Sequence, residues 1–125
     1  MNISSMSGHE PHTNMGAYSA SKSGLNILTK QMALEWVGYN IRVNAVSPGM
    51  IRTPLSEVVY QDEDIHNRRK EIVPVNRIGV GQDIADAVIF LSSAKSSYIT
   101  GQALVVDGGL TETILNYIPG RPGKK

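Results

Sequence analysis

The sequence predicts an α/β fold in which helices cover a parallel sheet, and three observations support this prediction. Residues 17–37 are a long proline-free stretch of good helix formers, which predicts a helix. Residues 41–46 and 103–106 read as strands, and the second is continuously apolar, as expected where both faces of a parallel sheet are covered. Residues 83–92 predict a second helix between these strands. With a short strand segment at residues 2–5, the order strand–helix–strand–helix–strand indicates an α/β parallel sheet.

The first predicted helix is apolar on two faces, so we expect it to pack against the sheet on one side and a partner subunit on the other. Asn14 is placed to cap its first turn through a side-chain oxygen, and Gly38 is placed to end it. The apolar residues form two stripes at helical spacings: Leu25, Leu28, Met32 and Trp36, and Ala20, Ile27 and Leu34.

Three segments do not follow this alternation. Residues 8–16 are a loop rich in glycine, proline and asparagine. Residues 54–78 combine an apolar, an acidic and a basic run, which indicates a long mobile insertion with room for short helices. The tail at residues 119–125 is too rich in glycine and proline to order by itself.

The composition excludes several classes of protein. The 125 residues suffice for one domain with a core but not for two. A formal charge of +1 gives no case for nucleic acid, and no apolar run approaches the ~20 residues that span a bilayer. Without cysteine there is no disulfide, thiolate metal site or thiol nucleophile. The first residues lack the pattern of a signal peptide, so we expect a cytoplasmic protein without a membrane or nucleic-acid partner.

Tyr18 and Lys22 are the first candidates for chemistry. They lie four residues apart on the predicted helix, so both side chains emerge on one face. A free phenol ionises near pH ~10, and a nearby ammonium group favours the phenolate, which suits a general acid and base near neutral pH. Ser5 lies thirteen residues before Tyr18, where its hydroxyl could hold a substrate oxygen. The Tyr–Lys pair alone is weak evidence, because most such pairs are exposed helix residues.

The surrounding motifs make the pair specific. In order they are Asn-Ile-Ser-Ser at 2–5, Ala-Tyr-Ser-Ala-Ser-Lys-Ser-Gly at 17–24, Ile-Arg-Val-Asn-Ala-Val-Ser-Pro-Gly-Met-Ile-Arg-Thr at 41–53, Thr-Gly-Gln at 100–102 and Asp-Gly-Gly at 107–109. Up to residue 110, the chain closely resembles the classical short-chain dehydrogenase/reductase (SDR) family. The resemblance implies a partial NAD(P)-binding, Rossmann-like, doubly wound parallel sheet, made of its C-terminal strands and helices only.

The resemblance also implies roles for individual side chains. Ser5 would orient and polarise the substrate oxygen, and Tyr18 would be the general acid and base. Tyr18 and Lys22 would also bind the cofactor, Lys22 through the nicotinamide ribose. Ser4 is the neighbouring alternative to Ser5, and the thirteen-residue spacing favours Ser5. The implied activity is that of an NAD(P)-dependent oxidoreductase that interconverts a secondary alcohol and a ketone by hydride transfer.

A turn after the second strand is implied to hold the nicotinamide. Its cofactor-binding residues would be Pro48, Gly49, Ile51 and Thr53, with the Ile51 backbone on the carboxamide and the Thr53 hydroxyl on the carboxamide or a phosphate. Without the resemblance, this segment is a common turn from a strand into a loop. Glycine permits close approach of a ligand there, and proline sets the direction in which the chain leaves the strand.

The resemblance divides the chain as one partial domain, residues 1–125. Asn44 and the sequence Asp107-Gly108-Gly109 are implied to be structural. The parts are residues 1–53 with the catalytic serine, the Tyr–Lys helix and the Pro-Gly turn, the substrate loop 54–78, the last helix and strand 79–110, and the tail 111–125.

The phosphate-cradling glycine turn of a dinucleotide-binding sheet belongs to its first half, and this sequence does not contain it. We therefore expect a truncated chain in which Met1 is an internal methionine, with an exposed edge of the sheet. Whether the cofactor is NAD or NADP, and which alcohol or ketone is the substrate, stay open. The two remaining classes are this oxidoreductase, as a homodimer or homotetramer, and a non-catalytic remnant or oligomerisation module without cofactor.

Three weaker patterns favour ordinary structure. Gly79-x-Gly81 has no preceding strand and no third small residue in register, so we interpret it as a loop that enters a helix. His9 and His12 have a metal-like spacing, but Pro11 lies between them and no other ligands complete a site, so we predict no metal and place them near the substrate. The basic run 68–70 indicates a solvated helix face.

Overall fold

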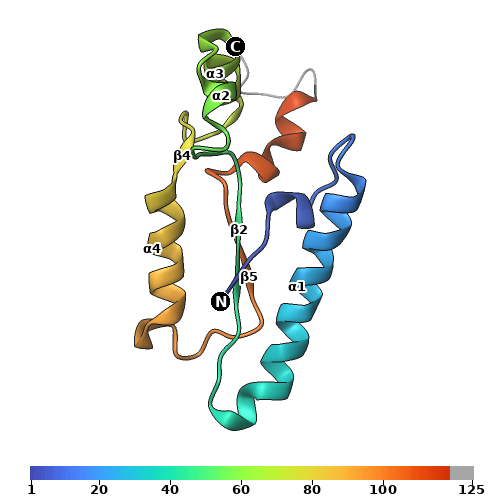
Figure 1. Cartoon of the computed structure of the whole chain (residues 1–125), viewed down its shortest axis with the longest axis vertical. Helices are drawn as coiled ribbons and strands as arrows, with labels where there is room; N and C mark the ends of the chain where they lie inside the picture. Colours follow the sequence, from blue (N-terminus) through green and yellow to red (C-terminus); the bar gives the residue numbers. More distant parts are fainter. Residues whose placement is uncertain (119–125) are drawn as a thin grey trace.

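A three-stranded parallel sheet forms the centre of the chain in the computed structural model, which describes residues 1–118 (Figure 1). Its order is β1 (Asn2–Ile3), β2 (Ala45–Pro48) and β5 (Ala103–Val106), with Ile3 opposite Val46 and Val46 opposite Leu104. β5 has the predicted bounds. The expectation that the tail 119–125 does not order by itself lies outside the described residues.

Two long helices lie on opposite sides of this sheet, which gives three layers (Figure 1). They are α1 (Gly16–Trp36), which lies between β1 and β2 in the chain, and α4 (Gly81–Ser92), which lies between β2 and β5. Parallel strands need such crossover connections, usually with a helix. Val46 of β2, which lies between Ile3 of β1 and Leu104 of β5, is 0% exposed. The predicted α/β class with a parallel sheet is therefore confirmed.

Most of the shorter elements lie beyond the carboxyl ends of the strands, whereas η2 and η3 lie at the opposite end of the sheet (Figure 1). Residues 54–78 contain two helices, as the mixed sequence predicted, whereas the two-residue pairing of β3 with β4 was not predicted. The bounds are η1 (Met6–Gly8), η2 (Val37–Tyr39), β3 (Ile51–Arg52), α2 (Glu57–Tyr60), α3 (Glu63–Ile72), β4 (Gly79–Val80), η3 (Ala94–Ser96) and η4 (Leu110–Tyr117).

Both predicted caps of α1 are wrong. Met15 precedes the helix without a side-chain cap, and Asn14 has a left-handed backbone with a φ of 64°, which turns the chain before the helix begins. At the other end, Gly38 continues into η2, and Asn40 adopts the left-handed conformation with a φ of 60°. Asparagine tolerates this conformation because its short polar side chain can bond locally, so it can end a helix where glycine was expected.

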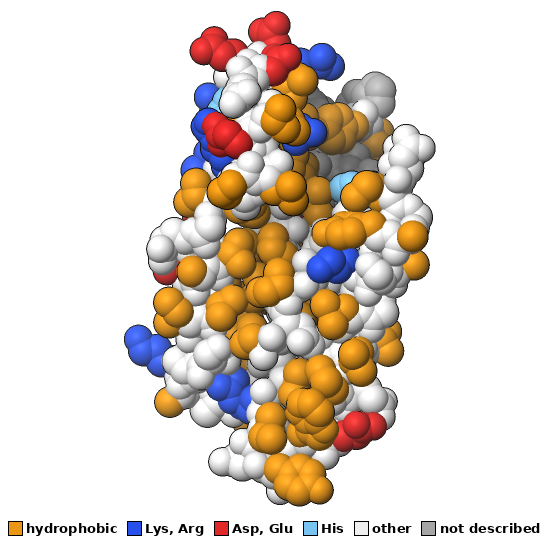
Figure 2. All heavy atoms as spheres, viewed as in Figure 1, with side chains coloured by type: hydrophobic (Ala, Val, Ile, Leu, Met, Phe, Trp, Pro, Cys, Tyr) orange, Lys and Arg blue, Asp and Glu red, His pale blue; other side chains and the backbone are white. Residues whose placement is uncertain are grey.

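Apolar side chains remain at the surface of α1 and at the free edge of β1. Leu34 is 77% exposed and Ile27 is 64% exposed on α1, so the second apolar stripe does not face the sheet. β1 pairs with β2 on one side and, within residues 1–118, has no strand on the other. Figure 2 shows apolar side chains spread over much of one face of the molecule. None of the helices in the described part of the chain is long and apolar enough to cross a bilayer.

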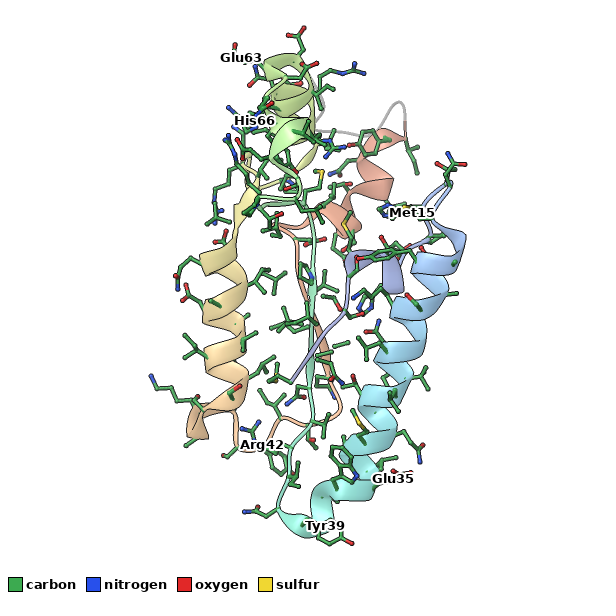
Figure 3. The ribbon with its side chains drawn as sticks, viewed as in Figure 1. Met15, Glu35, Tyr39, Arg42, Glu63 and His66 are labelled. Atoms are coloured by element: carbon green, nitrogen blue, oxygen red, sulfur yellow. The ribbon has the colours of Figure 1, made fainter. Side chains whose placement is uncertain are left out.

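The second strand begins later than predicted, at Ala45 rather than residue 41. Side chains hold the segment before it: Arg42 donates from Nη1 to the carbonyls of Leu91 (2.9 Å) and Ile99 (3.0 Å), which ties this segment to the end of α4 (Figure 3). Pro48 closes the strand, a position where a missing N–H costs little.

Asn44 joins the start of β2 to the loop before β5. Its Nδ2 donates to the Ile99 carbonyl at 2.9 Å, and its Oδ1 accepts from the Gln102 N–H at 3.0 Å. The side chain is 1% exposed, so water cannot replace either partner. Asn44 is therefore structural, as expected, although it braces the loop at 99–102 rather than the turn after β2.

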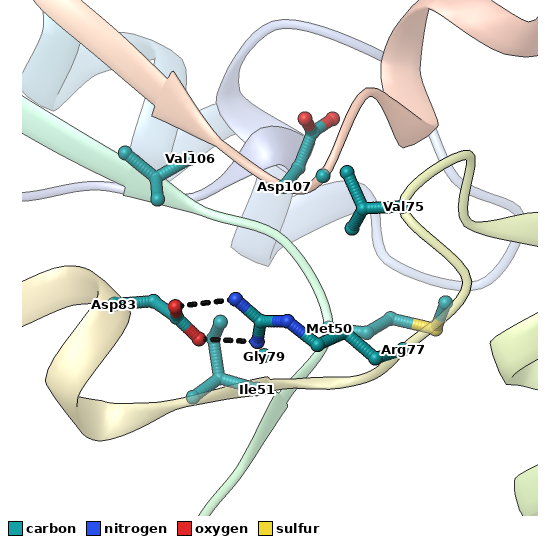
Figure 4. A pocket seen from close by; sticks show the side chains of 9 residues that line it. Met50, Ile51, Val75, Arg77, Gly79, Asp83, Val106 and Asp107 are labelled. Carbon is teal, nitrogen blue, oxygen red and sulfur yellow. Dashed lines mark hydrogen bonds and ion pairs between the residues drawn. The ribbon is translucent and has the colours of Figure 1, made fainter.

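Asp83 organises the start of α4. Its carboxylate accepts two bonds from the Arg77 guanidinium, at 2.6 and 2.7 Å, and one from the Val80 N–H at 2.8 Å (Figure 4). The bond from Arg77 and then the bond from Val80 hold the pKa of Asp83 well below its usual range. The carboxylate satisfies one of the N–H groups that a helix start leaves unpaired.

We predict that Asn44→Ala destabilises the fold. The substitution leaves the Gln102 N–H and the Ile99 carbonyl without their partner, and each such group costs about 1–3 kcal/mol when buried. Urea denaturation of the purified chain should show a loss of about 2–4 kcal/mol in the free energy of unfolding. Asn67→Ala makes the same change on the exposed face of α3 and serves as the control. Equal losses in both variants would contradict the assignment.

We predict that Asp83 makes stability depend on pH in the acid range. Because its pKa is lowered on folding, its contribution is fully present above the unfolded value near pH ~4 and is lost as the pH falls through the folded value. The stability difference between the natural chain and Asp83→Asn should therefore shrink as urea denaturation is repeated at pH values below about 4. Asp64→Asn on α3 is the control, and a difference that does not change with pH refutes the role of Asp83.

Candidate active site

The predicted site residues gather at the carboxyl ends of β1 and β2. Ser4 donates its N–H to the Val46 carbonyl at 2.8 Å, which extends the parallel register past the end of β1. Continuing that register brings Ser5 beside Pro48, the last residue of β2. Loops beyond this edge are where open α/β sheets bind their ligands.

The two adjacent serines have different partners. The Ser4 hydroxyl donates to the carbonyl of Lys22 at 3.1 Å, so it holds β1 against α1. The Ser5 hydroxyl oxygen accepts the Ser7 N–H at 3.1 Å and caps η1, which leaves its own hydrogen available to a further acceptor. This difference supports Ser5 over Ser4 as the serine that meets a substrate.

Tyr18 and Lys22 lie one turn apart on α1. The Lys22 Nζ is 5.7 Å from the centroid of the Tyr18 ring and donates to the Ile3 carbonyl at 3.0 Å. The Tyr18 side chain makes no hydrogen bond through its hydroxyl within residues 1–118, and the residue is 42% exposed. The helix therefore presents a free phenol beside an ammonium group whose position β1 fixes.

The turn after β2 is organised mainly by its own side chains. The Ser56 hydroxyl donates to the Ile51 carbonyl at 2.9 Å and lies 3.2 Å from the Thr53 hydroxyl. At Gly49, a Cβ would collide with the Asp107 side chain, so the end of β5 requires glycine there. The sequence reasoning assigned that glycine to the approach of a ligand, whereas the structure gives it a packing reason.

Asp107 and the two glycines after it close β5 as a structural turn, as expected. Burial alone would raise the pKa of Asp107, but bonds from the Thr111 N–H and side chain and from the Gly109 and Leu110 N–H groups outweigh it, so the pKa is lowered. Gly108 and Gly109 have φ angles of 66° and 87°, which few other residues adopt. The turn fixes where η4 begins.

A cavity of about 580 Å³ is lined by chain neighbours of the predicted site residues, although none of those site residues lines it. Met6, next to Ser5, and Met50, next to Gly49, line it together with Ile72 of α3. Residues 10–12 and residues of η4 complete the wall. The cavity is therefore lined by the chain neighbour of Ser5, the predicted catalytic serine, and by the chain neighbour of Gly49, in the predicted cofactor-binding turn.

The two loop histidines take separate positions. The His9 Nε2 lies 2.9 Å from the buried Ser47 hydroxyl and 3.2 Å from the Asn26 Nδ2, so this ring joins the loop to β2 and α1. His12 lines the cavity, and its expected place near the substrate stays a prediction. No group of three or more His, Asp or Glu side chains suited to a metal ion occurs among residues 1–118.

The structure brings only part of the predicted site into contact. Tyr18 and Lys22 form one group with Ser4 and Ile3, whereas within residues 1–118 no hydrogen bond joins Ser5 to Tyr18 or Lys22. Ile51 lines a smaller pocket of about 230 Å³ with Asp83 and Arg77 (Figure 4). No bond within the described residues links these two groups. A bound dinucleotide would have to span them.

Several residues that line the cavity were not predicted from the sequence. Met6 and Met50 could have been found, because each adjoins a predicted site residue. Glu10 lies in the loop between Ser5 and Tyr18 and offered a similar clue. Glu112 offered none, because no recognised motif extends to it and only the turn at 107–109 brings η4 back over the sheet.

The layered sheet and the site at its carboxyl edge define this chain as part of a doubly wound α/β protein. A family model described as enoyl-(acyl carrier protein) reductase matches residues 1–111. Dehydrogenase/reductase SDR family member 4 of Sus scrofa is 42% identical over 107 residues, which are 86% of this chain and 38% of that protein. The chain belongs to the short-chain dehydrogenase/reductase family.

Two solved structures show the same likeness. 4-Hydroxyisoleucine dehydrogenase complexed with NADH is 41% identical, with a TM-score of 0.84 over 89% of this chain and 46% of that one. An Agrobacterium tumefaciens protein with bound NADP is 39% identical, with a TM-score of 0.82 over 89% of this chain and 45% of that one. The chain spans less than half the length of these relatives.

Proposed function

We propose that the complete protein that carries this chain is an NAD(P)-dependent oxidoreductase that interconverts a secondary alcohol and a ketone. The observation that carries the proposal is the free, partly exposed Tyr18 side chain beside the Lys22 ammonium group, which is bonded to Ile3 of β1. A small molecule is the partner, and the cytoplasmic location stays a prediction.

In this proposal the side chains handle the proton and the substrate oxygen. Ser5 donates its hydroxyl hydrogen to the substrate oxygen, since its lone pair already accepts the Ser7 N–H. Tyr18 donates its proton to that oxygen as a ketone becomes an alcohol, and removes it in the reverse direction. Lys22 stabilises the phenolate that remains, because an ammonium group favours the charged form of a nearby phenol.

The residues present fit the nicotinamide end of the cofactor. An ammonium group has three N–H donors, and the Ile3 carbonyl accepts one from Lys22, so donors remain for the hydroxyls of a ribose. The Ile51 carbonyl keeps a second lone pair beside its bond from Ser56, which suits a carboxamide N–H, and Thr53 offers a hydroxyl. A bound NAD(P) supplies or accepts the hydride. NADH and NADP in the two related structures support either form.

A second candidate is an oligomerisation module that binds no cofactor. The exposed Leu34 and Ile27 on α1 support it, because contiguous apolar surface on a helix commonly marks a protein interface. The same surface suits a homodimer or homotetramer of the oxidoreductase, so exposure alone does not separate the two.

We predict that Tyr18→Phe in the complete protein lowers kcat by about 10²–10⁴-fold and leaves cofactor affinity nearly unchanged. The substitution removes the transferable proton and keeps the ring, and general acid–base catalysis is worth about this factor. Steady-state kinetics and fluorescence titration with NADH and NADPH measure the two effects.

Two further variants test this assignment. Tyr39→Phe makes the same change at the far end of α1 and should behave as the natural protein (Figure 3). Lys22→Ala should reduce both kcat and cofactor affinity. Substantial residual turnover in Tyr18→Phe would count against the role of Tyr18.

We predict that the purified 125-residue chain binds NADH or NADPH weakly but saturably if the oxidoreductase proposal holds. The nicotinamide-facing residues are present, whereas the glycine turn for the pyrophosphate is not in this sequence. Enhancement of cofactor fluorescence measures binding, and sedimentation equilibrium measures association. An absence of binding by a chain that still associates favours the oligomerisation module.

A further inference from the structure

We infer that the cavity lined by Met6 and Met50, the chain neighbours of Ser5 and Gly49, selects substrates that carry a positive charge, such as ketones and alcohols with an ammonium group. The inference rests on the proposed function and adds the substrate class. Glu10 and Glu112 are the residues that would set this preference. They reach the cavity from two segments that are far apart in the sequence, the loop before α1 and η4.

The cavity wall is apolar apart from a few groups, and those groups are acidic or neutral. Met6, Met50 and Leu110 supply apolar surface that suits a carbon ring. Glu10 and Glu112 are its carboxylates, while no lysine or arginine among residues 1–118 lines it. A cavity that presents two negative charges and no positive one favours a cation over a neutral molecule of the same shape, and disfavours an anion.

These two carboxylates differ from most other acidic groups near the site. Glu57 pairs with Arg52, Asp83 pairs with Arg77, and backbone N–H groups hold Asp107. By contrast, the Glu10 and Glu112 side chains make no hydrogen bond or ion pair within residues 1–118. Their charge is therefore not neutralised by a neighbouring side chain of the described part.

Two basic side chains of α3 lie on another surface. Arg68 and Arg69 line a separate groove on α3 with Ile65 and Ile72, and Arg69 lies 5.7 Å from the Tyr60 ring. Only Ile72 is shared by that groove and the cavity. His12 also lines the cavity, so the test is made at about pH 8, where imidazoles are ordinarily neutral and carboxylates are ionised.

Two ketones of nearly identical shape isolate the effect of charge. In 4,4-dimethylcyclohexanone a carbon atom occupies the position that a quaternary nitrogen occupies in 1,1-dimethyl-4-oxopiperidinium. We expect the complete protein to bind the cation more tightly by calorimetry, and to reduce it with a higher kcat/KM. 4-Oxocyclohexanecarboxylate should be the poorest of the three.

Single substitutions assign the effect to residues. Glu10→Gln and Glu112→Gln should each lower the preference for the cation about fivefold, as expected for one partly solvated charge pair, and the double variant more. Turnover of the neutral ketone should change much less than turnover of the cation in each of them. Glu35→Gln removes the same charge near the far end of α1 and should leave the preference as it is (Figure 3).

Failure of the inference is distinct from failure of the proposed function. Equal binding of the cation and the neutral ketone, no detectable binding of either, or an unchanged preference in the double variant overturns the inference. If no ketone is reduced with NADH or NADPH, the oxidoreductase proposal fails, and the calorimetric comparison still decides the charge preference.

Discussion

The parallel register between β1 and β2 is the constraint on which the candidate site depends. Parallel strands end at the same edge of a sheet, so Ser5 and Pro48 become neighbours although 42 residues separate them. The bond from the Ser4 N–H to the Val46 carbonyl fixes this register past the last paired residue. A shift of one residue would turn the Ser5 side chain to the other face of the sheet, because side chains alternate along a strand.

The helix with the Tyr–Lys pair is positioned by two reciprocal bonds to the same strand. The Ser4 hydroxyl donates to the backbone of Lys22, and the Lys22 ammonium group donates to the backbone of Ile3. Each bond holds α1 against β1 at the turn that carries Lys22. The phenol of Tyr18, one turn earlier, is left free while its charged neighbour is held, which is the division of roles that proton transfer requires.

Local pattern and chain-order motifs predicted the fold class, the two long helices and β5, because these features depend on periodicity and on short segments. The predicted caps of α1 were wrong because Asn14 and Asn40 adopt left-handed conformations that a helical pattern does not reveal. The predicted start of β2 was wrong because Arg42 and Asn44 donate hydrogen bonds to a distant loop. The pairing of β3 with β4 was missed because two-residue strands carry no periodicity.

The contrast between local sequence patterns and contacts of distant segments also separates the proposed catalytic residues from the residues proposed to set substrate charge. Ser5, Tyr18 and Lys22 lie at a strand end and on a helix, where short-range spacing fixes their geometry and a sequence motif can reveal them. Glu10 and Glu112 lie in connecting segments that meet only after the sheet forms and the turn at Asp107 directs η4 over its edge. Loops can change without disturbing the sheet, so the charge of the cavity can vary while the proposed proton-transfer group stays in place.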